Sequence, residues 1–309
     1  MSPTNIFAPV STPAESIVGL SIFVLATTAV VFVVVFGLLA YVVIKFRSRP
    51  LDGQREPPQV YGSTQVEMAW TVIPVLIVIA LFLASSRVLA SIQNAKPPAG
   101  ALEVIVTGHQ YWWEYRYPSL NIVTANELHV PVGVSTFITL LSADTDHSFW
   151  VPRLGGKTDL IPNHPNRTWI DPRETGLFLG QCAQYCGTQH AKMLLRVYVD
   201  TRQDFDRWVR EQQRPAQNGT SAGQRIFEST ACINCHTISG TAAAGKFGPD
   251  LTHLMTRETI AAGAAPNTRE MLHLWISNPD AVKPGSKMPA MGLNDRDVDA
   301  ITDYLETLR

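Results

Sequence analysis

Two long stretches without charge lie near the amino terminus and constrain the fold of this chain more than any other feature. No charged residue occurs between Glu15 and Lys45, and a second uncharged run lies between Glu67 and Arg87. A membrane-spanning helix needs about 20 apolar residues, and the first run alone is ample for one. Pro74 lies inside the second run, but membrane helices tolerate proline where neighbouring groups satisfy the freed carbonyl. We therefore predict a helical hairpin in the membrane.

The segment between the two runs is basic. It carries Lys45, Arg47, Arg49 and Arg55, whereas residues 1–14 carry no charged side chain. Basic loops stay on the cytoplasmic side, so both termini are expected on the other side. No basic segment precedes the first run, so we do not expect a cleaved signal peptide. The predicted location is a bacterial inner (cytoplasmic) membrane, with the remaining domains on the periplasmic side.

From residue 101 onward the pattern changes to short β-branched runs separated by Gly and Pro, which predict a β-sandwich or barrel. The predicted strands are 102–107, 135–141, 168–170 and 194–199. Helices are predicted at 222–230 and 269–277, and a final one begins after the N-cap Asn294 and ends near Leu308. The polar segment between the strands and the helices has no apolar periodicity, so it is predicted to be a linker of about ten flexible residues.

The predicted domain boundaries follow from this pattern. They are 1–96 for the tail and membrane hairpin, 97–211 for the β domain, 212–221 for the linker and 222–309 for the carboxy-terminal domain. The formal net charge is −1 and no Lys/Arg-rich run occurs, so a strongly basic nucleic-acid-binding protein is excluded.

The carboxy-terminal domain contains a c-type haem attachment motif, Cys232-Ile233-Asn234-Cys235-His236. The two thiols add to the porphyrin vinyl groups, and the adjacent histidine is the proximal iron ligand. A thioredoxin-like dithiol is the alternative, but no βαβ pattern surrounds the motif. We therefore predict one covalently bound haem c, and this domain is called the haem domain below.

The distal iron ligand is expected to be a methionine well after this motif. Met288 precedes a proline just before the last predicted helix, as is usual in small class I cytochromes c, and it is favoured over Met291. Met255 and Met271 lie in helical stretches, where packing is their expected role. Methionine–histidine ligation raises the haem potential.

A second cluster of soft ligands precedes the haem motif and consists of Cys182, Cys186, His190 and Met193. Thiolate and thioether ligands favour copper, and imidazole suits copper, zinc or iron. A zinc site and a local disulfide are the alternatives, but a zinc site has no use for Met193. A further histidine is needed, and His147 is the upstream candidate.

Several of these segments together resemble subunit II of haem–copper cytochrome oxidases. They are the soft-ligand loop, the His-Ser-Phe-Trp segment at 147–150, the aromatic run at 108–115 and the start of the second apolar run at 67–71. With the haem domain, the chain is similar to the cytochrome c-fused form found in caa-type oxidases. The resemblance covers about residue 15 to the end. It implies a two-helix transmembrane hairpin, a cupredoxin-like β-barrel CuA domain and an all-α class I cytochrome c domain.

In that family the loop holds CuA, a pair of copper ions bridged by two thiolates. The ligands that the resemblance implies are His147, Cys182, the backbone carbonyl of Gln184, Cys186, His190 and Met193. Most members carry Glu at position 184, and that carboxylate also reaches a magnesium ion shared with the catalytic subunit. Gln184 offers only a neutral amide oxygen, so a magnesium site stays open for this chain.

The resemblance also implies roles for other side chains. Tyr111 stands where many relatives place the Trp that receives electrons from soluble cytochrome c, and Trp112 and Trp113 follow it as further electron-transfer candidates. Glu67 falls where the family has an acid at the mouth of a proton channel, although an ordinary interfacial charge is the alternative. Around the copper site, Asp144 and Asp146 are predicted to orient two lysines of the haem domain, Lys283 and Lys287.

The implied function is that of the subunit through which electrons enter a respiratory terminal oxidase. Electrons would pass from haem c to CuA and then to the catalytic haem–copper subunit I, which reduces oxygen to water with proton translocation. Neither apolar run carries histidines for haem a or a third copper. The expected partners are subunit I, subunit III and a donor such as a quinol-oxidising complex or a cytochrome c. Two alternatives are a copper/haem electron-transfer or sensing module outside an oxidase, and a subunit of a nitrogen-oxide reductase.

Overall fold

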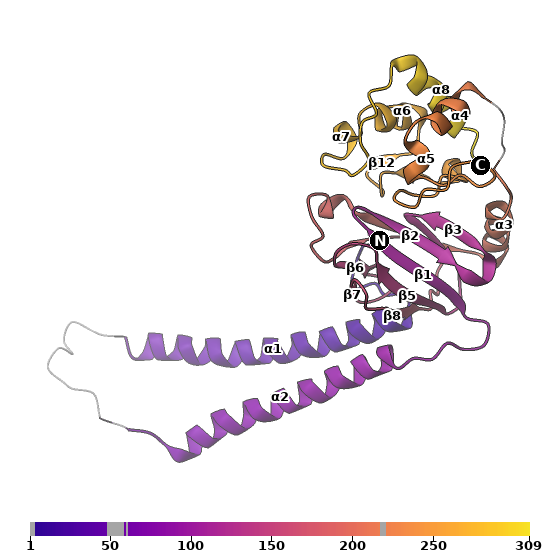
Figure 1. Ribbon diagram of the computed structural model, residues 1–309. Helices are drawn as coiled ribbons and strands as arrows, with labels where there is room; N and C mark the ends of the chain where they lie inside the picture. Colours follow the sequence, from indigo (N-terminus) through magenta and orange to yellow (C-terminus); the bar gives the residue numbers. More distant parts are fainter. Residues whose placement is uncertain (1–3, 48–58, 60, 217–220) are drawn as a thin grey trace. The chain divides into compact units, whose positions relative to one another are not determined.

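The computed structural model describes residues 4–47, 59, 61–216 and 221–309 (Figure 1). The chain divides into two compact units. The helical unit comprises Ser16–Asn94, and the large unit comprises Met1–Glu15 together with Ala95–Arg309. The large unit contains both the β domain and the haem domain, so the contacts between these two domains are part of one compact body.

The helical unit consists of the two predicted apolar helices. Helix α1 spans Thr12–Lys45 and α2 spans Thr64–Gln93, and both are long and apolar enough to cross a membrane. Pro74 lies inside α2 without ending it. The apolar side chains in the middle of both helices are exposed, as expected for a surface that faces lipid. Two residues of the predicted basic loop, Arg49 and Arg55, lie outside the described residues.

The β domain is built from two five-stranded sheets. One sheet has the order β3-β2-β1-β5-β8 and the other has the order β4-β10-β9-β6-β7. The strands of the first sheet are β1 Leu102–His109, β2 Trp112–Tyr117, β3 Ile122–Ala125, β5 Thr136–Ser142 and β8 Asn166–Ile170. Those of the second are β4 Glu127–Pro131, β6 His147–Trp150, β7 Thr158–Leu160, β9 Gly176–Cys182 and β10 Leu194–Asp200. The four predicted strands are thereby confirmed as β1, β5, β8 and β10, and the cupredoxin-like class is confirmed with them.

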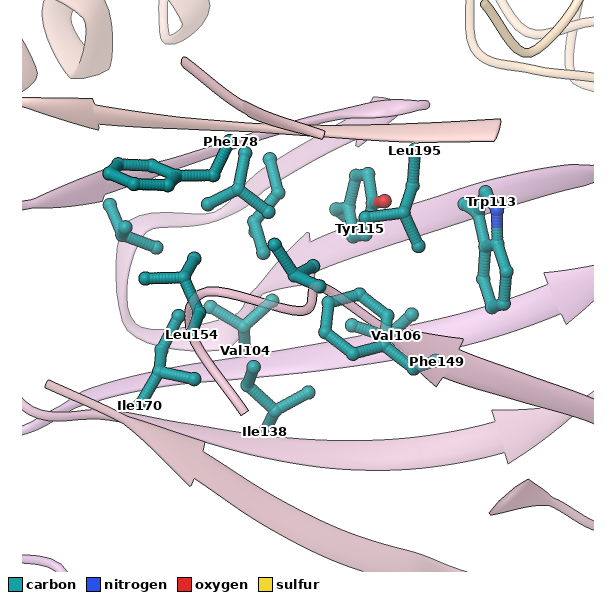
Figure 2. Packing of buried hydrophobic residues seen from close by; sticks show 14 of the residues in the cluster. Val104, Val106, Trp113, Tyr115, Ile138, Phe149, Leu154, Ile170, Phe178 and Leu195 are labelled. Atoms are coloured by element: carbon teal, nitrogen blue, oxygen red, sulfur yellow. The ribbon is translucent and has the colours of Figure 1, made fainter. Parts of the chain in front are cut away.

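An apolar core fills the β domain (Figure 2). Alternate residues of β1, among them Val104 and Val106, are buried, as a strand with one inward face requires. Aromatic side chains are the largest in this core, and Trp113 and Tyr115 of β2 are completely buried. Removing such an aromatic side chain typically costs about 3–5 kcal/mol, so this core gives the adjoining metal-binding loops a rigid base.

The haem domain has a separate apolar core and is helical apart from one short hairpin. Its helices are α4 Ala222–Ser229, α5 Cys232–Cys235, α6 Arg269–Ser277, α7 Pro279–Val282 and α8 Asp295–Leu305, and the hairpin consists of β11 Thr259–Ile260 and β12 Ala265–Pro266. Three short 3₁₀ turns of the chain are η1 Pro118–Leu120, η2 His190–Lys192 and η3 Leu254–Thr256. The three predicted helices are confirmed, and Asn294 caps α8 by accepting the Asp297 N–H at 3.0 Å.

The structure differs from the predicted boundaries at two places. An unpredicted helix, α3 Arg202–Gln212, ends in a buried Gln212 whose Nε2 donates to Thr256 Oγ1 at 3.1 Å, so this residue is not part of a linker. At the other end, Ser221 caps α4, and residues 217–220 lie outside the described ones. The second difference is the amino-terminal tail, whose Ser11 hydroxyl and Thr12 N–H donate to Asp171. The tail therefore belongs with the β domain.

Candidate metal centres

The loop at residues 182–193, called the copper loop below, brings its two cysteines together. The sulfur atoms of Cys182 and Cys186 lie 3.8 Å apart, and both side chains are buried and free. This distance is too long for a disulfide bond of about 2.05 Å. It does allow both sulfurs to bind one metal ion, since metal–thiolate bonds are about 2.3 Å long. Hydrogen bonding between the two sulfurs lowers the pKa of the Cys182 thiol, which favours the thiolate form that metals bind.

The other four predicted ligand groups surround the two sulfurs. Nδ1 of His147 lies 3.9 Å from the Cys182 sulfur, and the backbone oxygen of Gln184 lies 3.1 Å from it. On the other side, His190 Nδ1 and Met193 Sδ lie 3.7 and 3.8 Å from the Cys186 sulfur. The structure thus brings all six predicted groups to one place. Two thiolates, two imidazoles and a thioether form a soft donor set that fits copper.

His147 is held in the orientation that a metal ligand needs. Pairing of β6 with β9 sets Phe149 opposite Cys182, which places the start of β6 beside the copper loop. The Nε2 of His147 lies 2.8 Å from Asp144, whose carboxylate also accepts the Gln110 N–H at 2.6 Å. A carboxylate on one ring nitrogen fixes the tautomer and leaves the other nitrogen for a metal. Burial lowers the pKa of His147, but its partners Asp144 and Cys182 outweigh burial and raise it.

A cavity of about 730 Å³ lies beside the haem attachment motif. Cys232, Cys235 and His236 line it. The Nδ1–H of His236 donates to the Pro249 carbonyl at 2.8 Å, which leaves Nε2 for an iron ion. Gly248 lies directly against the imidazole, because a Cβ atom there would be 2.5 Å from His236 Cε1. The cavity therefore has the attachment thiols, an oriented imidazole and the space that a haem group requires.

The two candidate distal methionines, Met288 and Met291, line this same cavity and both are half-buried. The choice of Met288 therefore stays a prediction. Met255 and Met271 instead pack against the apolar core of the haem domain, as expected from the sequence.

Arg257 also lines the haem cavity, although sequence analysis did not select it. Its side chain is buried, and burial lowers its pKa. One guanidinium nitrogen donates to the Asp250 carbonyl at 2.6 Å, whereas Nε has no hydrogen-bond partner among the described residues. The charges of Asp250 and Glu127 partly offset the effect of burial on its pKa, and a further anion would stabilise this buried cation. The two carboxylates of a haem group would supply one, so this donor fits the predicted cofactor.

Residues 282–288 of the haem domain, called the docking segment below, lie against the copper loop. The Lys192 ammonium donates to the Val282 carbonyl at 3.3 Å, and the Gln189 amide donates to the Pro284 carbonyl. Gly285 faces Thr188, whose Cγ2 would lie 3.1 Å from a Cβ atom added to the glycine. Because Met288 ends this segment, a candidate iron ligand and the copper ligands lie at opposite sides of one interface.

The two predicted lysines of the docking segment are present at this interface, but the predicted acceptors are wrong. Lys283 is buried and donates to the carbonyls of Tyr111 and Ala261 at 2.8 and 3.0 Å. Lys287 donates to the side-chain oxygen of Gln110, not to Asp144. The Asp144 carboxylate instead binds groups of its own domain, namely His147 and two backbone N–H groups.

Two of the aromatic candidates, Tyr111 and Trp112, line the haem cavity, whereas Trp113 lies in the core of the β domain. The Tyr111 hydroxyl accepts the Thr188 N–H of the copper loop at 3.1 Å. Trp112 clusters with Ala125 and with Ala262 of the haem domain. Trp113 is completely buried and its ring lies edge-on to His147, with the ring centroids 6.0 Å apart.

Two further predictions concern side chains at the surface. Glu67 is exposed in the first turn of α2, and the side chain of Gln184 is exposed in the copper loop. The proton-channel role and the magnesium site both stay predictions.

Comparison with known proteins identifies the same three segments. The model of the cytochrome c oxidase subunit II transmembrane domain matches residues 3–88, that of its periplasmic domain matches 119–199, and that of cytochrome c matches 220–309. Cytochrome c oxidase subunit 2 of Alkalihalophilus pseudofirmus is 36% identical over 299 residues, which cover 94% of this chain and 85% of that protein. The Bacillus sp. (strain PS3) protein of the same name is 35% identical over 288 residues, covering 85% and 80%. Among solved structures, the periplasmic domain of cytochrome oxidase subunit II from Bradyrhizobium japonicum is 31% identical, with a TM-score of 0.37, and covers 38% of this chain and 97% of that one.

Proposed function

This chain belongs to the cytochrome c oxidase subunit 2 family, and from that membership we propose that it passes electrons from a covalently bound haem c to a dinuclear copper centre. Membership itself makes the chain an electron-transfer subunit of an oxidoreductase complex, with two membrane spans and partner subunits of the haem–copper oxidase type. The electron path and the identity of the ligands are the proposal.

At the copper site, Cys182 and Cys186 would bridge the two ions, and His147 and His190 would each bind one. Met193 and the Gln184 carbonyl would complete the set, in agreement with their distances to the two sulfurs. Such a pair supplies a one-electron carrier when bound. Asp144 contributes by holding the His147 ring in place, and a ligand set fixed in this way needs little rearrangement when its charge changes.

At the haem site, Cys232 and Cys235 would form the thioether bonds, and His236 and Met288 would bind the iron. The Pro249 carbonyl holds the His236 ring by its Nδ1–H. Arg257 would pair with a haem carboxylate, because its Nε points to no other acceptor among the described residues.

The observation that carries the proposed path is the contact of the docking segment with the copper loop. The side chain of Gln110 connects the two, since its Nε2 donates to the Cys186 carbonyl at 2.6 Å and its Oε1 accepts from Lys287. Lys287 directly precedes Met288. A short chain of covalent and hydrogen bonds thus joins a proposed copper bridge to a proposed iron ligand within one compact unit.

We also propose the surroundings of the protein. Lys45, the last residue of α1, and Arg47 after it support a cytoplasmic loop, so the β domain and the haem domain would lie on the periplasmic side of a bacterial inner membrane. Subunit I would accept the electrons for oxygen reduction, and subunit III would be a further partner. The external donor would be a quinol-oxidising complex or a cytochrome c.

Rapid reduction of the purified oxidase tests this function. The haem is reduced with a small chemical reductant, without added cytochrome c, and the haem and copper absorbance bands are followed in time. We expect a copper signal that follows haem reduction at a rate independent of protein concentration. In Cys186→Ser the haem should still be reduced, whereas the copper signal should be absent. A copper rate that rises in proportion to protein concentration would contradict the proposed path.

A further inference from the structure

Glu127, the first residue of β4, is a buried carboxylate that neither metal site uses. Its side chain is 2% exposed. Its two oxygens accept three hydrogen bonds, all from the haem domain: one from the Glu258 N–H at 3.1 Å, one from the Thr259 N–H at 2.9 Å and one from the Thr259 hydroxyl at 2.7 Å. A side chain of the β domain therefore holds the backbone of the haem domain directly.

The charge of this carboxylate acts on Arg196 and on the buried Arg257. Arg196 lies opposite Glu127 in the register between β10 and β4, and its Nε is 3.9 Å from the Glu127 carboxylate. The same guanidinium donates to the Glu258 carboxylate at 2.7 Å. A carboxylate removed from water is costly unless it is paired and fully hydrogen-bonded. Glu127 meets this condition only while the haem domain is docked, because undocking would leave it without its three donors.

The contact continues into the hairpin of the haem domain. Ala262, in the turn between β11 and β12, is 1% exposed and packs on Trp112 and Ala125. Its carbonyl accepts the Leu194 N–H at 3.2 Å, directly after the copper loop. The stretch at residues 258–262 is thus held in three ways: by charge-assisted hydrogen bonds, by a buried apolar contact and by a backbone hydrogen bond.

This stretch is also attached to the haem cavity. Arg257 directly precedes Glu258 and lines the cavity. Glu127 therefore fixes the segment that carries one wall of the haem site, and it does so without touching any proposed ligand of iron or copper.

We propose that Glu127 is a positioning residue, which holds the haem domain docked in the orientation from which electrons reach the copper centre. The proposal rests on the proposed function. It requires the haem domain to stay docked between electron transfers, rather than to undock from the copper loop and dock again for each transfer.

The test uses the purified oxidase with Glu127→Ala and Glu127→Gln, and Glu103→Ala as the control for an exposed carboxylate on β1. The rate of copper reduction by the haem is measured in buffers of increasing glycerol content. In the unaltered protein and the control, this rate should not depend on viscosity. In Glu127→Ala it should fall several-fold and decrease further with viscosity, because the domain must dock before each transfer. Glu127→Gln keeps one acceptor oxygen, so its rate of copper reduction should lie between those of the unaltered protein and Glu127→Ala.

Amide hydrogen exchange gives a second readout. Exchange at Glu258 and Thr259 should become at least about tenfold faster in Glu127→Ala, which corresponds to about 1.4 kcal/mol and to the lower end of the cost of leaving a buried N–H unpaired. The haem and copper absorption spectra, which report the ligands of each metal, should stay unchanged, which separates positioning from a general loss of structure.

The outcomes are distinguishable from a failure of the proposed function. If the unaltered protein shows no transfer from haem to copper within one molecule, the proposed function is wrong. If transfer is fast and Glu127→Ala leaves the rate, its viscosity dependence and the amide exchange unchanged, the positioning role is wrong. Altered ligation spectra of haem or copper in Glu127→Ala would also overturn it, because Glu127 would then act on the metal ligands themselves.

Discussion

Replacing Lys283 by Met should change how the stability of the haem domain depends on pH. Lys283 is 2% exposed, and its ammonium donates to two carbonyl oxygens without a carboxylate partner. Burial lowers its pKa from 10.5 to about 7, partly offset by Cys186 and assisted by Lys192. Copper bound to Cys186 would offset the thiolate charge, so the pKa would remain lowered in the loaded site.

The sign follows from the protons bound in each state. Above about pH 7 the folded protein has a neutral Lys283, whereas the unfolded chain keeps this lysine protonated up to about pH 10.5. The unfolded state binds more protons in this window, so the contribution of Lys283 to the free energy of unfolding rises with pH. The cost of burying the charged ammonium is fully present below about pH 7. With about 1.4 kcal/mol per pKa unit, it falls by about 2 kcal/mol between pH 7 and pH 9.

Urea unfolding of the haem domain in the purified protein, followed by haem absorbance from pH 6 to pH 9, measures this effect. The free energy of unfolding of the unaltered protein should rise relative to Lys283→Met by about 2 kcal/mol between pH 7 and pH 9. In Lys157→Met, which removes an exposed lysine, the free energy of unfolding should change with pH as it does in the unaltered protein. If Lys283→Met shows this same pH dependence, Lys283 is charged in the folded protein and the burial argument is wrong.

Three further substitutions test the sites. Cys186→Ser should remove the mixed-valence copper spectrum and lower the copper content from two ions, as measured by metal analysis; two equivalents of zinc in the native protein would contradict a copper site. Met288→Ala should abolish the sulfur-to-iron charge-transfer band and lower the haem potential, and the same loss in Met291→Ala alone would assign the ligand to Met291. Glu67→Gln should slow reduction of the catalytic haem while copper reduction stays intact, and unchanged turnover would make Glu67 an ordinary interfacial charge.

The sequence predicts those features whose signal is local. The copper loop carries four ligand side chains within twelve residues, and the haem motif carries three within five. Strands such as β1 and β10 alternate inward and outward side chains, so their period is visible in the sequence. His147 is different. Only the pairing of β6 with β9 brings it to the copper loop, and the sequence singled it out only because the four groups of that loop need a further histidine.

The burial and the partners of several charged residues could not be predicted from the sequence. Glu127 lies in the short segment of β4, where an acid normally indicates an exposed position. Arg257 looks like a surface residue in an irregular stretch, yet it lines the haem cavity. Lys283 was predicted to meet an aspartate and instead meets carbonyl oxygens. The partners of Glu127 and the Tyr111 carbonyl that Lys283 meets come from distant parts of the chain, so local composition carries no signal for them.

The docked arrangement gives a physical reason why Tyr111 can replace the usual Trp. Both polar ends of Tyr111 take part in the interface, because its carbonyl accepts from Lys283 and its hydroxyl accepts from the copper loop. Under the proposed function, a haem domain held by Glu127 and Lys283 would deliver electrons across contacts that are already made, so no soluble donor would need to bind an aromatic side chain at this position. A flexible tether alone would confine the domain only to a local concentration on the order of millimolar. The buried contacts of Glu127 and Lys283 would instead keep the haem domain on the surface of the β domain, and the external donor would then have to recognise the haem domain.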